Sequence, residues 1–554
     1  MGVNVRSMSR TIVIGAGPGG LTTAYELTKH NMQPLVLEAS AHVGGIARTE
    51  EYKGFRFDIG GHRFFTKVPE VEALWHEVLG DDFIRVRRLS RIYFRGKFFN
   101  YPIQLFNAFK NLGVYESVRV MLSYAKWQVR PHEKEDTFDQ WVINRFGGRL
   151  YWFFFRSYTE KVWGIPPSRI RSDWAAQRIK NLSLMKALVN ALTGANDTTS
   201  LINEFYYPRL GPGMMWERFR KEVEVRGGEV RMGCAVTGLK LEQNRVAGVV
   251  VKDQDKTYEL TADHVVSSMP LSSLVFQLQP PAPDHVVEAA KQLKHRDFLI
   301  VTLILNKPDP FPDNWIYIHT PNVKVGRIQN FRSWSRDMVP HPDKASLGME
   351  YFCHEGDGLW TMKDQDLIQL ATEELTEIGL AKAGDVVDGT VIRQPKAYPV
   401  YDEHYQQNVT IIRDFLAGIE NLQTIGRNGM HRYNNQDHSM LTAMLAVRNI
   451  LGEHHDLWNV NVERSYHEEF VANKSENVSQ FRPKPAARDA TDIAGYQGPE
   501  RRSGGDRRAS LDDQYVEILW DPSKDKRRVR KDRRQQNSGR SQYQDKVSSR
   551  QSQS

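Results

Sequence analysis

Three glycines near the start of the chain have the spacing of a nucleotide-binding turn. Gly15, Gly17 and Gly20 directly follow a β-branched run, and a helical pattern then leads to a second apolar run that ends in Glu38. Gly15 permits a tight turn, Gly17 lets a pyrophosphate approach the positive end of the helix, and Gly20 lets helix and strand pack closely. The Glu38 carboxylate can accept hydrogen bonds from ribose hydroxyls. Strand, turn, helix, strand and acid in this order predict a dinucleotide site.

A second glycine pair lies just beyond Glu38 and indicates which dinucleotide is bound. Gly44 and Gly45 are followed at a short distance by Arg48. This arrangement resembles the extended FAD fingerprint of the amine-oxidase-like flavoproteins, in which Gly-Gly and an arginine soon follow the acid. The resemblance implies that the backbone at both glycines passes close to the cofactor phosphates and that Arg48 contacts a phosphate or the flavin. FAD is therefore the expected cofactor.

The composition is that of a globular protein without membrane spans. The chain has 554 residues, of which 40% are hydrophobic and 26% charged, enough for two to four structural units. No apolar run approaches the ~18 residues of a membrane span, and no secretory signal precedes the first strand. The two cysteines, Cys234 and Cys353, make neither a disulfide framework nor a metal site. We expect a cytoplasmic protein with no metal and no integral membrane segment.

The net charge of +8 is concentrated at the C-terminus. Residues 471–554 hold 19 Lys and Arg against 12 Asp and Glu, a net +7, which leaves the preceding part almost neutral. Apolar residues also become rare there, which predicts a basic disordered tail. Such a tail suits an acidic partner, either nucleic acid or an acidic membrane, or it is a solvated segment without a specific partner.

The elements that position the glycine turn alternate along the chain with other segments. Strand and helix patterns of a nucleotide-binding domain recur in separate pieces, an aromatic-rich helical segment follows the first piece, and antiparallel strands follow the second. This interleaving resembles the glutathione-reductase-like FAD fold of amine oxidases, in which the substrate domain is inserted in pieces. The predicted α/β fold has a discontinuous Rossmann domain (9–75, 206–294 and 421–470), a helical substrate or flap domain (76–205), an antiparallel-sheet substrate domain (295–420) and the tail (471–554).

Five downstream segments combine residue types suited to a flavin and a phosphate-bearing ligand. They are Asp58-x-Gly60-Gly61-His62, Tyr101-Pro102-x-Gln104, Val162-Trp163-Gly164-x-Pro166 through Trp174 to Arg178, Trp315-x-Tyr317 with Arg327, and Gly426-Arg427 with Tyr433 and Asn435-Gln436-Asp437-His438-Ser439. Arginine suits a diphosphate because its planar fork makes paired, charge-assisted hydrogen bonds. Together the segments resemble the UDP-galactopyranose mutases, particularly the eukaryotic-type branch. The chain departs from their pattern at Leu105 and Phe106, where the mutases have asparagines, so the nucleotide stays open.

The resemblance implies a role for each segment. His62 contacts the flavin near its reactive nitrogen and can respond to its redox state, since the unperturbed pKa of histidine lies near neutrality. Arg178 and Arg327 hold the substrate diphosphate and, with His62, are the expected catalytic residues. The expected substrate ligands are Tyr101, Gln104, Arg178, Tyr317, Arg327 and Tyr433. The further cofactor ligands are Gly61, Gly426, Arg427, Asn435, Gln436, Asp437 and Ser439.

The resemblance also implies the reaction. Pyranose and furanose forms of a nucleotide sugar interconvert through a reduced-flavin sugar adduct, with no net redox change. The FAD must then be reduced, and NAD(P)H is a candidate external reductant. The chain shows no convincing pair of catalytic carboxylates, so proton transfer in this reading uses the flavin itself.

Two other functions stay open. Amine oxidases, protoporphyrinogen oxidases and phytoene desaturases share the N-terminal fingerprint and a segment like Tyr207-Pro-x-x-Gly-Pro-Gly213. An enzyme of that kind oxidises a bulky apolar or amine substrate, and the aromatic residues between 141 and 174 suit either such a pocket or an ordinary core. The third possibility is a non-catalytic FAD-bound scaffold that presents the basic tail. The arginine pair and the Asn-Gln-Asp-His-Ser string favour the sugar nucleotide.

Overall fold

The computed structural model describes residues 10–101, 103, 105–172 and 204–461. Gln104, Arg178 and the basic tail, residues 471–554, lie outside these ranges, so what the sequence predicts for them stays a prediction.

A five-stranded parallel sheet carries the glycine turn. Its order is β20-β13-β1-β2-β9, with β1 in the centre, and every neighbouring pair is parallel. The strands are β1 (Thr11–Ile14), β2 (Leu35–Leu37), β9 (Glu229–Arg231), β13 (His264–Ser267) and β20 (Leu422–Thr424). Helices α1 (Pro18–Lys29), α9 (Pro212–Val225) and α15 (Gln436–Ile450) share one apolar core with β1 and β2. The sheet is thus assembled from distant parts of the chain, as the predicted α/β fold requires.

The glycine turn between β1 and α1 depends on two missing side chains. Gly15 has a φ of +96°, and a Cβ there would lie 2.3 Å from the Ser268 hydroxyl. A Cβ at Gly20 would lie only 1.8 Å from the Gly15 carbonyl oxygen. The positive φ and the nearby Ser268 therefore explain Gly15, and close packing of α1 on the turn explains Gly20.

A smaller mixed sheet, with three antiparallel strands and a short fourth strand that pairs in parallel, adjoins the Rossmann sheet. It is built from β12 (Lys256–Thr261), β11 (Arg245–Asp253), β10 (Cys234–Glu242) and the short β14 (Leu278–Gln279). Helices α10 (Leu271–Phe276), α11 (Asp284–Gln292) and α14 (Tyr405–Leu416) pack into the same apolar cluster.

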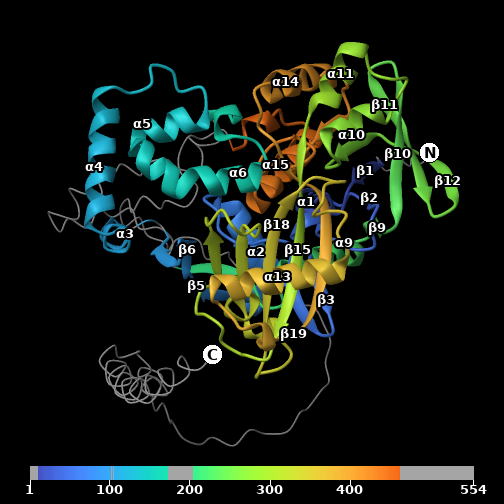
Figure 1. Ribbon diagram of the computed structural model, residues 1–554. Helices are drawn as coiled ribbons and strands as arrows, with labels where there is room; N and C mark the ends of the chain where they lie inside the picture. Colours follow the sequence, from blue (N-terminus) through green and yellow to red (C-terminus); the bar gives the residue numbers. More distant parts are fainter. Residues whose placement is uncertain (1–9, 102, 104, 173–203, 462–554) are drawn as a thin grey trace, which may run out of the picture. The chain divides into compact units, whose positions relative to one another are not determined.

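The third large sheet is seven-stranded and lies under α13 (Asp364–Ile378) (Figure 1). Its order is β19-β15-β18-β17-β16-β6-β7, and β16 pairs with β6 in parallel while the other pairs are antiparallel. The strands are β6 (Ser90–Phe94), β7 (Lys97–Asn100), β15 (His295–Leu305), β16 (Trp315–Ile318), β17 (Arg327–Asn330), β18 (Ala345–Cys353) and β19 (Val386–Pro399).

Within the prediction's range of 76–205, the described residues contain strands as well as helices. The helical part consists of α3 (Leu105–Leu112), α4 (Val114–Val129), α5 (Phe138–Tyr151), a π-helical turn (Trp152–Arg156) and α6 (Ser157–Trp163). The same range also supplies β5 (Phe83–Arg87), β6, β7 and the first residues of β8 (Glu204–Pro208). Arg95 and Gly96 both have positive φ, +51° and +74°, as a two-residue hairpin turn requires. An arginine at a position that usually holds Asn, Asp or Gly concealed that hairpin.

A buried carboxyl joins the first hairpin to β8. Asp58 ends β4 (Phe55–Asp58), which pairs with β3 (Thr49–Tyr52). The Tyr207 hydroxyl donates to one Asp58 oxygen, and the Thr49 hydroxyl donates to the other at 3.1 Å. Burial raises the pKa of Asp58 to about 7, although both hydrogen bonds oppose the rise. This contact fixes the strand that leads into the Gly60–Gly61–His62 loop.

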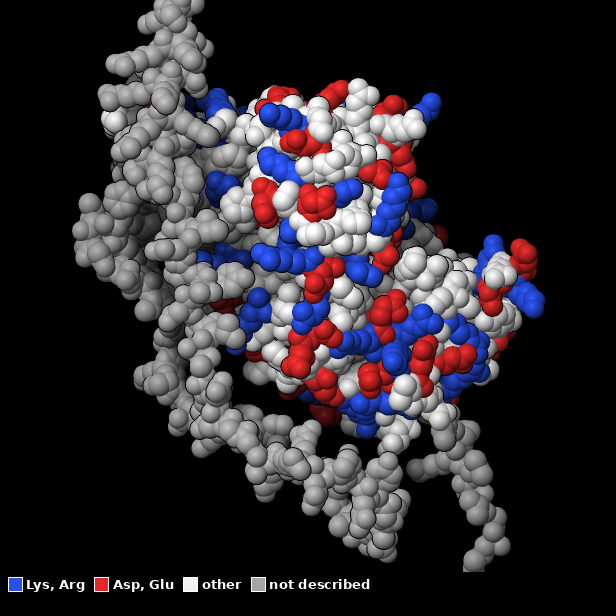
Figure 2. Space-filling model, turned by 90° about the horizontal axis from the view of Figure 1, so that it is seen from below, with Lys and Arg blue, Asp and Glu red and all other residues white. Residues whose placement is uncertain are grey.

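The surface seen in Figure 2 interleaves acidic and basic side chains, so that face offers no extended patch of one sign. Within the described residues, no helix combines the length and apolarity needed to cross a bilayer.

Replacing Asp58 with Asn should change how stability depends on pH. Because the native pKa of about 7 lies above the ordinary 3.8, the wild type loses stability as pH rises from about 4 to 7. Asp58→Asn removes that loss. Between pH 5 and pH 8 its free energy of unfolding should gain about 2–3 kcal/mol relative to the wild type, measured by urea titration. Thr49→Val keeps the titrating carboxyl and should keep the slope, whereas parallel pH profiles for Asp58→Asn and wild type would contradict the assignment.

Candidate functional site

A single cavity of about 850 Å³ connects the glycine turn with the helical segment, at the large end of the range for ligand pockets. Its walls come from the loops after β1, β2, β4 and β20, from β16, β17 and β19, and from the helical residues 138–163. Pieces of chain that the sequence separates by hundreds of residues thus share one site.

Two helix N-termini face the nucleotide end of this cavity. Gly17 is the N-cap of α1, and a Cβ there would meet no atom within 4 Å, so the space beside it is open. Asn435 is the N-cap of α15, and Gln436, Asp437 and Ser439 of its first turn line the cavity. The exposed N–H groups and dipoles of helix N-termini favour anions. This end of the cavity is therefore suited to a pyrophosphate.

Glu38 lies at the end of β2 with its carboxylate fixed by the backbone. One oxygen accepts from the Ala16 N–H at 2.7 Å and the other from the Ser40 N–H at 2.9 Å. The carboxylate is held against the glycine turn and lines the cavity. That Glu38 accepts hydrogen bonds from ribose hydroxyls stays a prediction.

The Gly44–Gly45 pair brings its backbone against the glycine turn. The Gly44 N–H donates to the Ala16 carbonyl at 2.8 Å, and a Cβ at Gly45 would lie 3.5 Å from Gly17 Cα. Arg48 donates to Glu50, to the Gly45 carbonyl at 3.0 Å and to Gln394 at 2.8 Å. The Arg48 guanidinium is thus held by protein atoms at the cavity wall.

His62 is neutral in the structure, which differs from the near-neutral pKa that the sequence suggests. Burial lowers its pKa to about 3, and the positive charges of Arg427 and Arg327 lower it further. Its Nδ1 lies 3.1 Å from the Gly60 carbonyl oxygen. Since a carbonyl can only accept, we assign the proton to Nδ1, which leaves Nε2 as an acceptor.

Arg327, the first residue of β17, forms an ion pair with the buried carboxylate of Glu350 on β18. Its Nε and Nη2 lie 2.7 and 2.6 Å from Glu350 Oε2, and Gln329 donates to Oε1 at 2.6 Å. Glu350 is fully buried, and its charge raises the pKa of Arg327 well above the usual value despite burial. A Cβ at Gly60 would lie 3.6 Å from Arg327 Nη2, so the ion pair lies directly beside the His62 loop.

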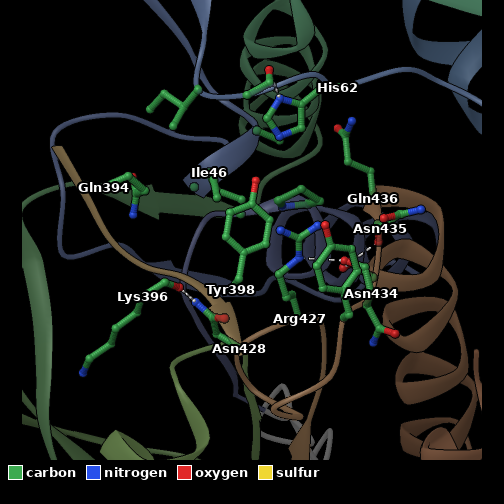
Figure 3. A pocket seen from close by; sticks show the side chains of 18 of the residues that line it. Ile46, His62, Gln394, Lys396, Tyr398, Arg427, Asn428, Asn434, Asn435 and Gln436 are labelled. Carbon is green, nitrogen blue, oxygen red and sulfur yellow. Dashed lines mark hydrogen bonds between the residues drawn. The ribbon is translucent and has the colours of Figure 1, made fainter. Parts of the chain in front are cut away.

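A second guanidinium, that of Arg427, lies beside two stacked tyrosines. The rings of Tyr398 and Tyr433 are 5.6 Å apart and nearly parallel, and Arg427 lies 5.6 and 4.9 Å from their centroids. It donates to the Asn434 carbonyl at 2.8 Å and to that of Ala397 at 3.4 Å. Figure 3 shows the Tyr398 hydroxyl directed toward the His62 loop, with Arg427 beside the ring.

The opposite wall is aromatic. Tyr317 lies between Tyr101 and Tyr158, at ring distances of 5.0 and 5.6 Å, and Tyr158 stacks on His319 at 4.6 Å. Burial lowers the pKa of His319 to about 3.

Lys161 connects the helical segment to the seven-stranded sheet by hydrogen bonds. Its Nζ donates to the Ile318, Thr320 and Val325 carbonyls at 3.2, 2.6 and 3.1 Å, and burial lowers its pKa to about 8.

The loop before α15 holds the first turn of that helix. The Asn435 N–H donates to His438 Nδ1 at 3.2 Å, and the Ser439 hydroxyl donates to the Asn435 carbonyl at 3.0 Å. Asn434, which is buried, donates to the Gly426 carbonyl at 2.9 Å. The Asn-Gln-Asp-His-Ser string therefore caps a helix and lines the cavity at once.

Most residues that the sequence singles out meet in the cavity. Those lining it are Gly15, Gly17, Glu38, Gly45, Arg48, Gly61, His62, Tyr101, Tyr317, Arg327, Gly426, Arg427, Tyr433, Asn435, Gln436, Asp437 and Ser439. Gly20 and Gly44 are absent from the lining and support the turn from behind. Arg178 lies outside the described residues, so its predicted meeting with Arg327 is untested. Arg427 is the second described guanidinium beside His62.

Several cavity residues were missed from the sequence. Tyr158, His319, Gln394, Lys396 and Tyr398 all line the site. They belong to no motif, and in the sequence they are indistinguishable from strand and helix residues. The positive φ of Lys396, +52°, marks the irregular end of β19 only once the backbone is known. No group of three or more metal-ligating side chains occurs in the part of the chain that the structure describes.

The model of the flavin containing amine oxidoreductases matches residues 18–401, and the chain belongs to this family. Family membership implies a flavin cofactor and a flavin-dependent enzyme. Two curated relatives match over short stretches: an inactive all-trans-retinol 13,14-reductase of Danio rerio (49% identical over 49 residues) and a 15-cis-phytoene desaturase of Arabidopsis thaliana (34% over 85 residues). These matches cover 9% and 15% of this chain and only 8% and 15% of the relatives.

Solved structures with the same fold carry different chemistries. Reduced UDP-galactopyranose mutase superposes with a TM-score of 0.72 at 19% identity, covering 83% of this chain and 99% of the other. A protoporphyrinogen oxidase named as putative, from an Exiguobacterium species, gives 0.60 at 18% over 80% and 99%. Putrescine oxidase bound to putrescine gives 0.54 at 14% over 80% and 99%. At these identities the likeness establishes the amine-oxidase-like FAD fold alone.

The residues present fit FAD. The open space at Gly17, the two helix N-termini and the fixed Glu38 carboxylate suit the adenosine diphosphate part of the cofactor. The His62 loop and the Arg327 and Arg427 guanidinium groups line the same cavity, and their role toward the flavin ring stays a prediction.

Substitutions at Gly17 and Gly20 should separate cofactor binding from folding. Gly17 is extended, with φ −77°, so Gly17→Val should fold with an unchanged urea midpoint of the apoprotein but fill the open space. We expect its FAD content after purification, measured from the flavin and protein absorbances, to fall at least about tenfold. Gly20→Val should instead lower the urea midpoint, because its side chain meets backbone. Stoichiometric FAD in Gly17→Val would contradict the assigned cradle.

Proposed function

We propose that the protein is a FAD-dependent mutase that interconverts ring forms of a nucleotide sugar, as its likeness to UDP-galactopyranose mutase suggests. The supporting observation is the pair of guanidinium groups, Arg327 and Arg427, beside His62. Only one carboxylate, Glu350, forms an ion pair with either of them among the described residues. That part of the cavity therefore carries net positive charge.

A positive site favours one kind of ligand over another. The same field that lowers the pKa of His62 attracts a diphosphate and repels a protonated amine. Arginine is also the side chain best suited to paired hydrogen bonds with phosphate oxygens. The charge thus supports an anionic substrate over the amines that other members of the family oxidise.

The side chains around the positive centre can orient such a ligand. Arg327 is fixed by Glu350 and Gln329, so its guanidinium is held in place before a ligand arrives. The hydroxyls of Tyr317, Tyr398 and Tyr433 line the cavity and can donate to phosphate or sugar oxygens. In the proposed reaction the reduced flavin supplies the nucleophile for the anomeric carbon, and the protein supplies binding and orientation.

A second candidate function is oxidation of a bulky apolar substrate. It is favoured by the apolar part of the wall, in which Ile92, Phe138, Phe154 and Phe155 line the cavity. An apolar substrate would leave both guanidinium groups without an anionic ligand, which is why we place this function second.

Activity assays on the wild type should separate the two functions. Anaerobic protein reduced with dithionite should convert UDP-galactopyranose to the furanose form, followed by chromatography, with no lasting change in flavin absorbance. Absence of isomerisation, together with oxygen consumption or dye reduction on an apolar or amine substrate, would contradict the mutase.

Substitution of Arg327 should test the positive centre. Arg327→Lys keeps the charge but loses the fork that bridges Glu350 and the ligand, so we expect kcat/KM for isomerisation to fall about 100-fold. Arg91→Lys is the matched control. Arg91 forms a similar two-bond pair with the buried Asp313, at 2.8 and 2.6 Å, yet does not line the cavity. Equal losses in both variants would indicate a general structural effect and not a role in binding.

A further inference from the structure

Exposed apolar side chains are concentrated on one helix. Eleven large apolar side chains are exposed among the described residues, and five of them lie on α4. These are Val114, Tyr115, Val118, Leu122 and Val129, with exposed fractions of 83%, 72%, 52%, 66% and 79%. Single exposed apolar residues are ordinary, whereas a contiguous group marks an interaction surface.

The exposed residues of α4 form an ordered surface. Val114, Val118, Leu122 and Val129 are separated by four, four and seven residues, which places them in one stripe along the helix. We call this the apolar stripe. Three exposed cations, Arg119, Lys126 and Arg130, repeat at spacings of seven and four and form a row along one side of it. The helix therefore presents an apolar face bordered by positive charge.

The inner face of α4 is firmly held. Val120 and Tyr124 are buried, and a Cβ at Gly147 of α5 would lie 2.9 Å from the Tyr124 backbone. Arg149 of α5 donates to Glu116 at 2.6–3.0 Å. Figure 1 shows α4 at the outer edge of the helical segment, beside α5. The apolar stripe thus belongs to a well-packed helix and is not the result of a loosened one.

We infer that the outer face of α4 docks on an anionic lipid membrane surface, with the helix lying in the plane of the interface. The apolar stripe would enter the boundary between headgroups and acyl chains, and the cationic row would meet lipid phosphates. A second copy of the chain fits this face less well. Glu116 is the only acid on α4, and it is already bound by Arg149 of α5 and by Arg119 of its own helix, so a second copy of α4 would bring no free carboxylate to the cationic row.

Vesicle flotation of the full-length, flavin-loaded protein tests this surface. The wild type should float with vesicles of phosphatidylcholine and phosphatidylglycerol and bind pure phosphatidylcholine much less. The double variant Val118→Ser/Leu122→Ser should bind the anionic vesicles about tenfold more weakly. Val225→Ser/Val387→Ser removes two apolar side chains exposed by 73% and 46% on other elements and should bind like the wild type.

The outcomes distinguish the other occupants. If the stripe variant floats like the wild type, any vesicle binding comes from elsewhere, such as the basic residues 471–554, and the inference is overturned. It is equally overturned if light scattering shows a dimer that the stripe variant loses while its vesicle binding is unchanged. Arg119→Gln/Lys126→Gln/Arg130→Gln should remove the preference for anionic vesicles. Unaltered flavin content in every variant verifies folding.

Discussion

The buried ion pair between Arg327 and Glu350 is the interaction on which the site depends. Glu350 is fully buried, so its charge is tolerable only with close partners, and Arg327 and Gln329 supply hydrogen bonds to both oxygens. The pair sits on neighbouring strands, β17 and β18, which hold it in register. It carries a fixed positive group from the seven-stranded sheet to the His62 loop of the nucleotide-binding part. Removing either partner would leave the charge of the other uncompensated in a buried position.

The His62 loop can come this close to the seven-stranded sheet because glycines, which carry no side chain, stand at the points of contact. Gly60 and Gly61 allow the loop to approach Arg327 and Gln329, since a Cβ at Gly61 would lie 2.8 Å from the Gln329 amide nitrogen. Gly20 likewise lets α1 pack closely against the dinucleotide turn. Asp58, joined to Tyr207 and Thr49, fixes the strand from which the loop emerges. The two ends of the cavity are thus held relative to each other by close approaches at glycines together with these buried side-chain hydrogen bonds.

How far the sequence predicts this arrangement depends on whether a feature is local. The turn, its glycines and Glu38 are specified within about thirty residues, so strand, helix and fold class could be predicted from them. The β6–β7 hairpin was missed because its turn residue, Arg95, is unusual there. Tyr398 and Tyr158 could not be identified because their importance comes from which distant elements meet. The low pKa of His62 likewise comes from its burial in the assembled cavity and, in addition, from the charges of Arg427 and Arg327, which lie hundreds of residues away in sequence.

The balance of charge around His62 decides between chemistries that the fold alone permits. The positive charge of Arg327 is largely compensated by Glu350. Arg427 instead donates hydrogen bonds to carbonyl oxygens and lies beside tyrosine rings. Of these two guanidinium groups, Arg427 therefore brings a positive charge beside His62 that no recognised ion pair of the described residues offsets, in surroundings where burial lowers the pKa of His62. Water screens such a charge poorly inside the protein, so its attraction for an anion is strong there. A substrate that delivers a diphosphate completes this charge balance, whereas an amine would add a second cation to it.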